Sequence, residues 1–307
     1  MRIAVAGTCG LALIIAREIQ EKTTHQLLIL SRNHQPGLIS QGYQCQIVDY
    51  NDPGSIQHSL MGVDTVISTV PGNAQIRLIE AAVHCRVRRF APAEFEGRPA
   101  LRIPNDPLDR GKKVALSTLH RYRANIQSTV FVCGIFYERF SVNGLASHRI
   151  GVHLGFSNEG DYIVDARNMT AQAPVYDPAG NMATLCMTSA YDVGQFVVKA
   201  LDLPQWPAEL FVCGEKLTVN QLVNTIKQCR GRDFTNVQYH NLETLRYELT
   251  LAQMAGDVQQ QKRLFTLIAT VEGRYTFQAP TFPNTQFPNF YPRRFRDWFL
   301  QNWAGVP

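Results

Sequence analysis

The first 135 residues alternate short apolar runs with stretches of helical periodicity. The apolar runs show no strict alternation with polar residues, and they lie at residues 3–6, 27–30, 45–48, 64–68, 89–91 and 129–132. Such runs are typical of strands buried on both faces, as in parallel sheets that helices cover on each side. Helical patterns stand between them, at residues 11–20, 75–85 and 112–123. This part of the chain therefore predicts an α/β domain with a doubly wound parallel sheet.

The residue composition and periodicity of the sequence change after about residue 135. Residues 139–183 are rich in Gly, Asn, Asp and Pro, whereas helical patterns return at 189–201 and 240–272. Thr218 precedes a further helical pattern and is predicted to be its N-cap. We expect two interleaved domains. The sheet domain is expected to comprise residues 1–135 with 185–215, and a smaller second domain residues 136–184 and 216–307.

The composition excludes several classes of protein. An apolar content of 45% is too high for a disordered chain, and a net charge of +5 over 307 residues gives no concentrated footprint for nucleic acid. No apolar run reaches the length of a membrane span, and Gly7 and Gly10 interrupt an N-terminus that otherwise resembles a signal peptide. The seven cysteines include no Cys-x-x-Cys pair, and the eight histidines show no metal spacing. We therefore expect a cytoplasmic protein with reduced thiols, no metal, and neither nucleic acid nor membrane as partner.

A glycine-containing turn joins the first predicted strand to the first predicted helix. It consists of Gly7, Thr8, Cys9, Gly10, Leu11 and Ala12. Glycine permits a tight turn and lets the backbone approach a dinucleotide pyrophosphate, whose charge suits a helix N-terminus. The pattern is imperfect, because Leu13 takes the third glycine position in one register and Cys9 the middle position in the other. A purely structural turn is the alternative.

The residue after the second predicted strand bears on the choice of dinucleotide. NAD sites usually place Asp or Glu there to bind the ribose hydroxyl groups. This chain has Ser31 and Arg32 instead, with no acidic residue nearby. A guanidinium can bind a 2′-phosphate through two hydrogen bonds, so Arg32 favours NADPH or NADP as cofactor. An ordinary surface arginine is the alternative.

Two segments carry a family resemblance. Residues 64–70 (DTVISTV) and 88–97 (RRFAPAEFEG) resemble the corresponding stretches of the NmrA-like and isoflavone-reductase-like atypical short-chain dehydrogenases. The resemblance implies an NAD(P)-binding Rossmann domain and a C-terminal domain that binds the substrate. It also implies that the glycine turn holds the pyrophosphate and Arg32 the 2′-phosphate. The further cofactor contacts that it implies are Ser68, Thr69, Val70, Pro92, Ala93, Glu94 and Phe95.

Reductases of this family use a lysine in the helix after the Pro-x-Glu-Phe segment. None of the eleven tyrosines here has a lysine four residues later, so the usual Tyr-x-x-x-Lys dyad is absent. The resemblance implies Lys112 as the catalytic counterpart, with Lys113 as the alternative. A lysine there can hold the cofactor ribose and exchange a proton with the substrate oxygen. The alternative is that both lysines form a solvated basic helix start.

Aromatic residues mark where a substrate pocket is expected. Phe136, Tyr137 and Phe140 follow the last predicted strand of the sheet domain, and a later set comprises Phe282, Phe287, Phe290 and Tyr291. Aromatic side chains there suit a flat, apolar ligand, and core packing is the equal alternative.

These observations favour an NADPH-dependent reductase of a hydrophobic carbonyl or enone metabolite, aromatic or polyketide-like, in secondary metabolism. A dinucleotide-sensing regulator is the first alternative, in which the basic clusters at Arg86, Arg88 and Arg89 and at Arg293, Arg294 and Arg296 face a partner protein. A non-redox isomerase or cyclase on the same fold is the second. The oligomeric state is left open, with a homodimer as one option.

Overall fold

The computed structural model describes residues 1–278, 287 and 290–306, and the chain divides into two compact units. The first unit comprises Met1–Phe95, Asp109–Phe131 and Val193–Leu210. The second unit comprises Glu96–Leu108, Val132–Asp192 and Phe211–Pro307. The segment 96–108 thus belongs to the second unit, although the sequence analysis assigned it to the sheet domain. The second unit also contains more of the chain than the first, in contrast to the smaller domain expected.

The first unit is built on a six-stranded sheet in which all neighbouring strands are parallel. The strand order is β3-β2-β1-β4-β5-β7, so the chain starts in the middle of the sheet and winds outward in both directions. The predicted doubly wound Rossmann sheet is confirmed. The strands are β1 (Arg2–Ala6), β2 (Gln26–Ser31), β3 (Cys45–Ile47), β4 (Thr65–Ser68), β5 (Arg89–Ala91) and β7 (Gln127–Ser128).

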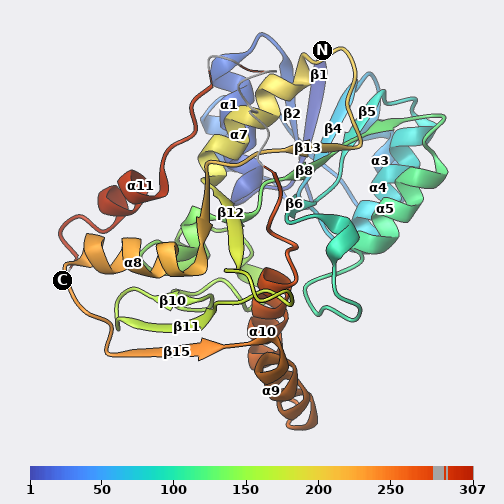
Figure 1. The fold of residues 1–307 in the computed structure, drawn as a ribbon. Helices are drawn as coiled ribbons and strands as arrows, with labels where there is room; N and C mark the ends of the chain where they lie inside the picture. Colours follow the sequence, from blue (N-terminus) through green and yellow to red (C-terminus); the bar gives the residue numbers. More distant parts are fainter. Residues whose placement is uncertain (279–286, 288–289, 307) are drawn as a thin grey trace. The chain divides into compact units, whose positions relative to one another are not determined.

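Helices cover both faces of this sheet (Figure 1). On one face α3 (Pro53–Leu60), α4 (Asn73–His84) and α5 (Lys112–Arg121) bury a hydrophobic core against the strands. On the other face lie α1 (Leu11–Lys22) and α7 (Ala190–Leu201). Gly194 permits their close contact, because a Cβ at this position would lie 2.8 Å from the Ile14 side chain. A short helix, α2 (Pro36–Ser40), follows β2.

The last strand of the sheet differs from the prediction. Residues 129–132 were expected to form it, but β7 takes this place, with Gln127 N donating to Arg88 O at 3.0 Å. The apolar residues that follow form β8 (Val130–Val132), which belongs to a short sheet with β6 (Phe95–Glu96) and β13 (Glu209–Phe211). Both residues of β7 are polar and half-buried, so an edge strand of this kind leaves no apolar signal in the sequence.

The second unit combines two small three-stranded sheets with helices. One sheet has the order β14-β12-β9 and the other the order β10-β11-β15. The predicted cap at Thr218 is confirmed, since its side chain and that of Gln221 form a capping box. The helical region predicted at 240–272 is interrupted at Gly256, where φ is +67°. The bounds are β9 (Ile135–Phe136), β10 (Val164–Asp165), β11 (Thr170–Pro174), β12 (Thr184–Thr188), β14 (Glu215–Thr218), β15 (Asn236–His240), α6 (Gly144–Ser147), α8 (Val219–Arg230), α9 (Leu242–Met254), α10 (Val258–Val271), α11 (Phe295–Asn302) and the 3₁₀ turns η1 (Pro99–Leu101), η2 (Tyr137–Phe140) and η3 (Val152–Leu154).

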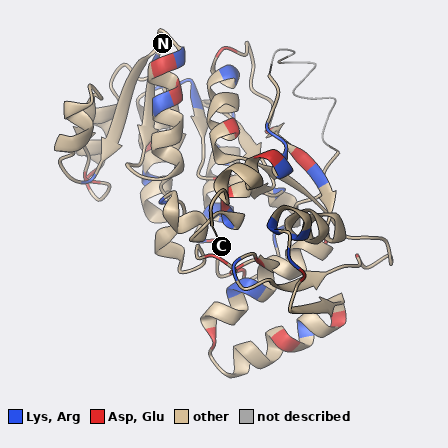
Figure 2. Ribbon diagram, turned by 90° about the vertical axis from the view of Figure 1, so that its left-hand side faces the viewer, with Lys and Arg blue, Asp and Glu red and all other residues tan. Residues whose placement is uncertain are grey.

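Charged residues of both signs are interspersed along the helices and strands (Figure 2). Among the described residues, no helix has the length and apolar character that crossing a membrane would require. The same part of the chain contains no group of three or more His, Cys, Asp or Glu side chains arranged to hold a metal ion.

Glu138 is a carboxyl group buried completely within the second unit. Its oxygens accept hydrogen bonds from Ser189 Oγ and Ala190 N, both at 2.8 Å, at the start of α7. Burial raises the pKa of Glu138 from 4.5 to about 7, against the opposing effect of these hydrogen bonds. This group therefore titrates near neutrality inside the folded protein.

We expect Glu138→Gln to remove a pH dependence of stability. Between pH 4.5 and about 7 the folded state keeps a proton that the unfolded chain has released. Stability therefore falls as the pH rises through this window, and above it the ionised carboxylate costs about 3 kcal/mol. The glutamine amide still accepts from the Ala190 N–H and does not titrate. Urea unfolding near pH 5 and near pH 8 gives the change in the free energy of unfolding with pH for the wild type and for Glu138→Gln. An equal change in both proteins would contradict the expectation.

Candidate functional site

The glycine turn after β1 is tightly packed at Gly7. Gly7 has a φ of +130°, and a Cβ there would lie 2.2 Å from Thr69 Oγ1 and 3.1 Å from Ala12 Cβ. Gly10 is the N-cap of α1, with a φ of +54°. This helix begins with no side-chain cap and no acidic residue in its first turn. The positive end of its dipole is therefore suited to an anion.

The residues after β4 lie against this turn. Thr69 donates both its backbone N–H and its hydroxyl to Ala6 O, each at 2.9 Å, and thereby links the end of β4 to the end of β1. The Ser68 hydroxyl accepts from Val70 N at 3.2 Å and turns the chain away from the strand. The predicted residues Ser68, Thr69 and Val70 thus adjoin the glycine turn.

The residues after β5 form a tight turn. Glu94 N donates to Pro92 O at 2.7 Å, and Ala93 N donates to Gln75 Oε1 at 2.6 Å. The Phe95 ring is buried and stacks on the Phe131 ring with 5.5 Å between centroids. The Phe95 side chain is therefore part of the core. Of the four predicted cofactor contacts in this segment, Pro92, Ala93 and Glu94 lie in the turn at the carboxyl end of β5.

Lys112 and Lys113 are the first two residues of α5, and they differ in exposure. Lys112 is half-buried, whereas Lys113 is exposed. Asp109 caps the helix, since its carboxylate accepts from Gly111 N at 3.1 Å and from Lys113 N at 3.3 Å. The burial favours Lys112 over Lys113 as the lysine of a site.

The segment before Lys112 approaches the start of α4 closely. Arg110 and Gly111 both have positive φ angles, +46° and +79°. A Cβ on Gly111 would lie 3.2 Å from Gly72 Cα, and Gly72 is the N-cap of α4. The starts of α4 and α5 are therefore held in backbone contact by two glycines.

Arg32 follows β2 and is exposed. The Ser31 hydroxyl accepts from Asn33 N at 3.2 Å and sets the turn that carries Arg32. Burial raises the pKa of Tyr50 to about 12, and the nearby charge of Arg32 acts in the opposite direction. The guanidinium therefore lies near Tyr50, which follows β3.

These segments share one edge of the sheet. The strands are parallel, so the carboxyl ends of β1, β2, β4 and β5 lie at the same edge, and each is followed by one of the predicted segments. In doubly wound sheets ligands bind outside this edge. Sequence reasoning missed Gly72 and Gln75, which contact the predicted segments from α4. In a single sequence, a glycine before a helix and a glutamine in its first turn carry no signal of such contacts.

Two of the predicted substrate contacts belong to the core of the second unit. Tyr137 is 0% exposed, its ring packs 5.2 Å from that of Phe295, and its hydroxyl donates to Arg293 O at 3.0 Å. Phe140 is 2% exposed and packs 5.5 Å from Phe295. We therefore interpret both as core residues, which leaves Phe136, half-buried at the end of β9. Of the later aromatic residues Phe290 is buried and Tyr291 exposed, and Phe282 lies outside the described residues.

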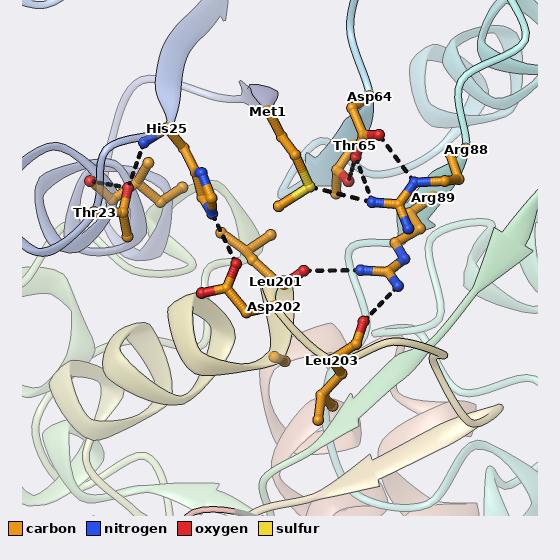
Figure 3. Close-up of polar contacts among 12 residues, drawn as sticks. Met1, Thr23, His25, Asp64, Thr65, Arg88, Arg89, Leu201, Asp202 and Leu203 are labelled. Carbon is orange, nitrogen blue, oxygen red and sulfur yellow. Dashed lines mark hydrogen bonds and ion pairs between the residues drawn. The ribbon is translucent and has the colours of Figure 1, made fainter.

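The basic cluster at residues 86–89 is not a free cationic surface. Arg88 pairs with Asp64 at 2.9 Å, and Arg89 is 1% exposed and donates to carbonyl groups at the end of α7 (Figure 3). Burial alone would raise the pKa of Asp64, but hydrogen bonds from Arg88 and Thr65 lower it below its usual value. Arg89 therefore contributes no charge to the surface, and the exposed charge of Arg88 is paired with Asp64, so this cluster presents less net charge to a partner than its sequence indicates.

Comparisons with known proteins agree with the resemblance found in the sequence. Oxidoreductase BOA1 of Botryotinia fuckeliana (strain B05.10) is 25% identical over 253 residues, which cover 78% of this chain and 79% of that protein. Among solved structures, the leucoanthocyanidin reductase–NADPH complex from Vitis vinifera has a TM-score of 0.73 at 18% identity, covering 98% of this chain and 99% of that chain. AtPrR2 with NADP+ and (+)pinoresinol has a TM-score of 0.74 at 17% identity, covering 98% of each chain.

These solved structures share the fold with this chain at identities too low to transfer a substrate. The family itself is shown by a model of the NmrA-like family, which matches residues 1–274 and therefore includes the glycine turn, the turn after β5 and the start of α5. With nine-tenths of its length covered by that match, the chain belongs to the NmrA-like family.

Proposed function

We propose that this protein is an NADP(H)-dependent reductase of a hydrophobic carbonyl or enone compound, and that Lys112 assists the proton transfer. The observation that carries the proposal is the edge of the parallel sheet. There the N-terminus of α1 without a side-chain cap, a turn in which Gly7 packs against Thr69, and a half-buried lysine all lie in the first unit.

The residues at this edge fit a dinucleotide. The turn from Gly7 to Ala12 brings the end of β1 close to Thr69, since any Cβ on Gly7 would clash with the Thr69 side chain, and a backbone turn of this kind is where a pyrophosphate would bind. The start of α1 offers the positive end of its dipole, although the N–H groups of Ala12 and Leu13 already donate to Cys9 O and Gly10 O. Arg32 offers a guanidinium for the 2′-phosphate, and no acidic residue stands beside it in the sequence. The bound nicotinamide would supply the hydride of the reduction.

Lys112 would act as the proton-handling residue. A lysine at the first position of a helix is unfavourable for the helix, because its charge faces the positive end of the dipole. The ammonium group can donate a hydrogen bond to the ribose or to the substrate oxygen, and it can give that oxygen a proton as negative charge develops. Ser68, Thr69, Val70 and the turn at Pro92–Glu94 would bind the rest of the cofactor, as the family resemblance implies.

The substrate class is supported by the relatives and by one residue of the second unit. The curated relative is named an oxidoreductase, and the AtPrR2 structure contains (+)pinoresinol, an aromatic compound. Phe136 stays a candidate for contact with an apolar or aromatic substrate. A role in fungal-type secondary metabolism accords with these names.

The test is NADPH consumption in the presence of aromatic ketones and enones. We expect the absorbance of the reduced nicotinamide to fall only when a carbonyl or enone acceptor is present. Tight NADPH binding without consumption on the whole panel would contradict the proposal and favour a dinucleotide-sensing regulator. Product formed at constant NADPH absorbance would favour a non-redox isomerase or cyclase.

The choice of cofactor can be tested at Arg32. We expect Arg32→Ser to weaken NADPH binding about 10- to 100-fold, because charge-assisted hydrogen bonds to the 2′-phosphate are lost, while NADH affinity stays within about twofold. Fluorescence titration with both dinucleotides measures the two affinities. Lys22→Ser removes the same charge at the far end of α1 and serves as the control. An equal loss of affinity for NADH would contradict a 2′-phosphate contact.

A further inference from the structure

Gln75 is a buried amide in the first turn of α4 that uses only part of its hydrogen-bonding capacity. The residue is 1% exposed, and its Oε1 accepts from Ala93 N at 2.6 Å. Its Nε2 has no hydrogen-bond partner among the residues that the structure describes. The backbone N–H of Ala93 requires an acceptor, which fixes the oxygen rather than the nitrogen toward it.

This arrangement does not favour the stability of the fold. A buried donor without an acceptor costs about 1–3 kcal/mol, whereas one neutral hydrogen bond contributes about 1 kcal/mol. An apolar side chain of the same length would avoid this unpaired donor but would leave the Ala93 N–H without its acceptor. The amide at position 75 is therefore better explained by what its oxygen holds in place than by a contribution to folding.

The oxygen of Gln75 holds the turn after β5. Pro92 has no N–H of its own, and Glu94 N already donates to Pro92 O at 2.7 Å. The bond from Ala93 N to Gln75 Oε1, in contrast, joins this turn to α4. This side-chain oxygen thus links the turn directly to α4.

The same turn of α4 also contacts the start of α5. Gly72, three residues before Gln75, lies so close to Gly111 that a Cβ on Gly111 would be 3.2 Å from Gly72 Cα. Gly111 immediately precedes Lys112. One helical turn therefore contacts both the turn after β5 and the segment that carries the lysine, and all of these residues belong to the first unit.

We propose that Gln75 is a positioning residue, whose amide oxygen fixes the Pro92–Glu94 turn at a set distance from Lys112. The inference rests on the proposed function, in which this turn and Lys112 bind the two sides of the reacting group. Misplacement of such a group by about 1 Å can lower a rate by up to 100-fold, so a single oriented oxygen has a large effect on the rate.

Gln75→Met is the first variant, and it removes the oxygen at nearly constant length. We expect the Ala93 amide proton to exchange about tenfold faster or more with solvent deuterium in the protein without cofactor, because its acceptor is gone. We expect kcat to fall about tenfold or more and the NADPH Kd to change less than about threefold. Gln75→Glu keeps an oxygen acceptor toward Ala93 and removes the Nε2 donor, and it should restore both the protection and most of the rate.

Gln57→Met on α3 of the same unit is the matched control, and its exchange at Ala93 and its kcat should equal those of the wild type. Unchanged exchange at Ala93 in Gln75→Met would overturn the inference, whatever the activity. Faster exchange with an unchanged kcat would also overturn it, since catalysis would then not depend on the position in which Gln75 holds the turn. Failure of Gln75→Glu to restore protection would do the same.

The two proposals can fail separately. Absence of NADPH consumption by the wild type overturns the proposed reductase, and the exchange of the Ala93 amide proton is measured without cofactor or substrate. If Gln75→Met does not fold, the comparison of Gln75→Glu with the wild type still tests whether Gln75 acts through its oxygen. Loss of Ala93 protection in that variant contradicts positioning through the oxygen, and retained protection with retained kcat supports it.

Discussion

Replacing Lys112 with methionine is expected to lower kcat about 100-fold or more while NADPH binds within a few-fold of the wild-type affinity. The methylene groups of the side chain are retained, so packing at the start of α5 is preserved. The lost ammonium would no longer give a proton to the substrate oxygen, and such positioned proton donors contribute about 10²- to 10⁴-fold to a rate. The measurement is steady-state kinetics on whichever carbonyl or enone compound the wild type reduces, with NADPH titration in parallel.

The fold should tolerate this substitution. A positive charge at the first helical position opposes the helix dipole, so its removal is expected to be neutral or slightly stabilising, by less than about 1 kcal/mol. Lys113→Met is the matched control, because Lys113 is the next residue and is exposed. We expect its kcat to stay within about twofold of the wild type. An equal loss in both variants would contradict the choice of Lys112, and no loss in either would contradict lysine-assisted reduction.

The first unit was largely predictable from the sequence because its strands are buried on both faces. Runs such as Leu27–Leu30 carry no polar residue, and only a covered parallel sheet accommodates a series of them. The site follows from the same topology, since residues after parallel strands share an edge. The family resemblance added Lys112, which composition and periodicity alone would not distinguish from a solvated helix start.

The remaining parts were not predictable because they depend on contacts between distant segments. Gln75 contacts Ala93, and Gly72 contacts Gly111, yet neither pair shares a periodicity or a motif. The second unit is held together by short strands and by aromatic packing of Tyr137 on Phe295 and Trp298, from opposite ends of that unit's sequence. An aromatic residue after a strand has the same appearance in a sequence whether it packs in a core or lines a pocket.

The basic cluster at residues 86–89 illustrates the same point for charges. A run of arginines most often indicates a solvated face, and its sequence cannot reveal which guanidinium is buried. In the structure Arg88 is paired near the surface, while the adjacent Arg89 is enclosed (Figure 3). Arg89 is the first residue of β5 and Arg88 precedes the strand, so two neighbouring arginines reach different surroundings.

Arg89→Met is expected to destabilise the protein by about 3–5 kcal/mol, the largest effect on stability that we predict. The Arg89 guanidinium donates to the carbonyl oxygens of Leu201 at 2.8 Å and Pro204 at 2.9 Å, to Leu203 O, and to Gln127 Oε1 at 3.1 Å. It also lies 5.2 Å from the Trp206 ring. Methionine fills much of the same volume but leaves these acceptors unpaired, at about 1–3 kcal/mol for each one that water does not reach. The charge itself is favourable at the C-terminal end of α7.

Arg88→Met is the control, because it removes the same group one residue earlier. The Arg88 side chain is 47% exposed, and a surface ion pair of this kind contributes about 0–1 kcal/mol. Urea unfolding followed by circular dichroism gives the free energy of both variants, provided that the dependence on denaturant stays equal to that of the wild type. The stability of Arg89→Lys should lie between those of Arg89→Met and the wild type. A compact ammonium group cannot donate to all the acceptors that the planar guanidinium reaches. A loss below about 1 kcal/mol in Arg89→Met would mean that water replaces the guanidinium at these carbonyl groups, and that Arg89 does not anchor the end of α7.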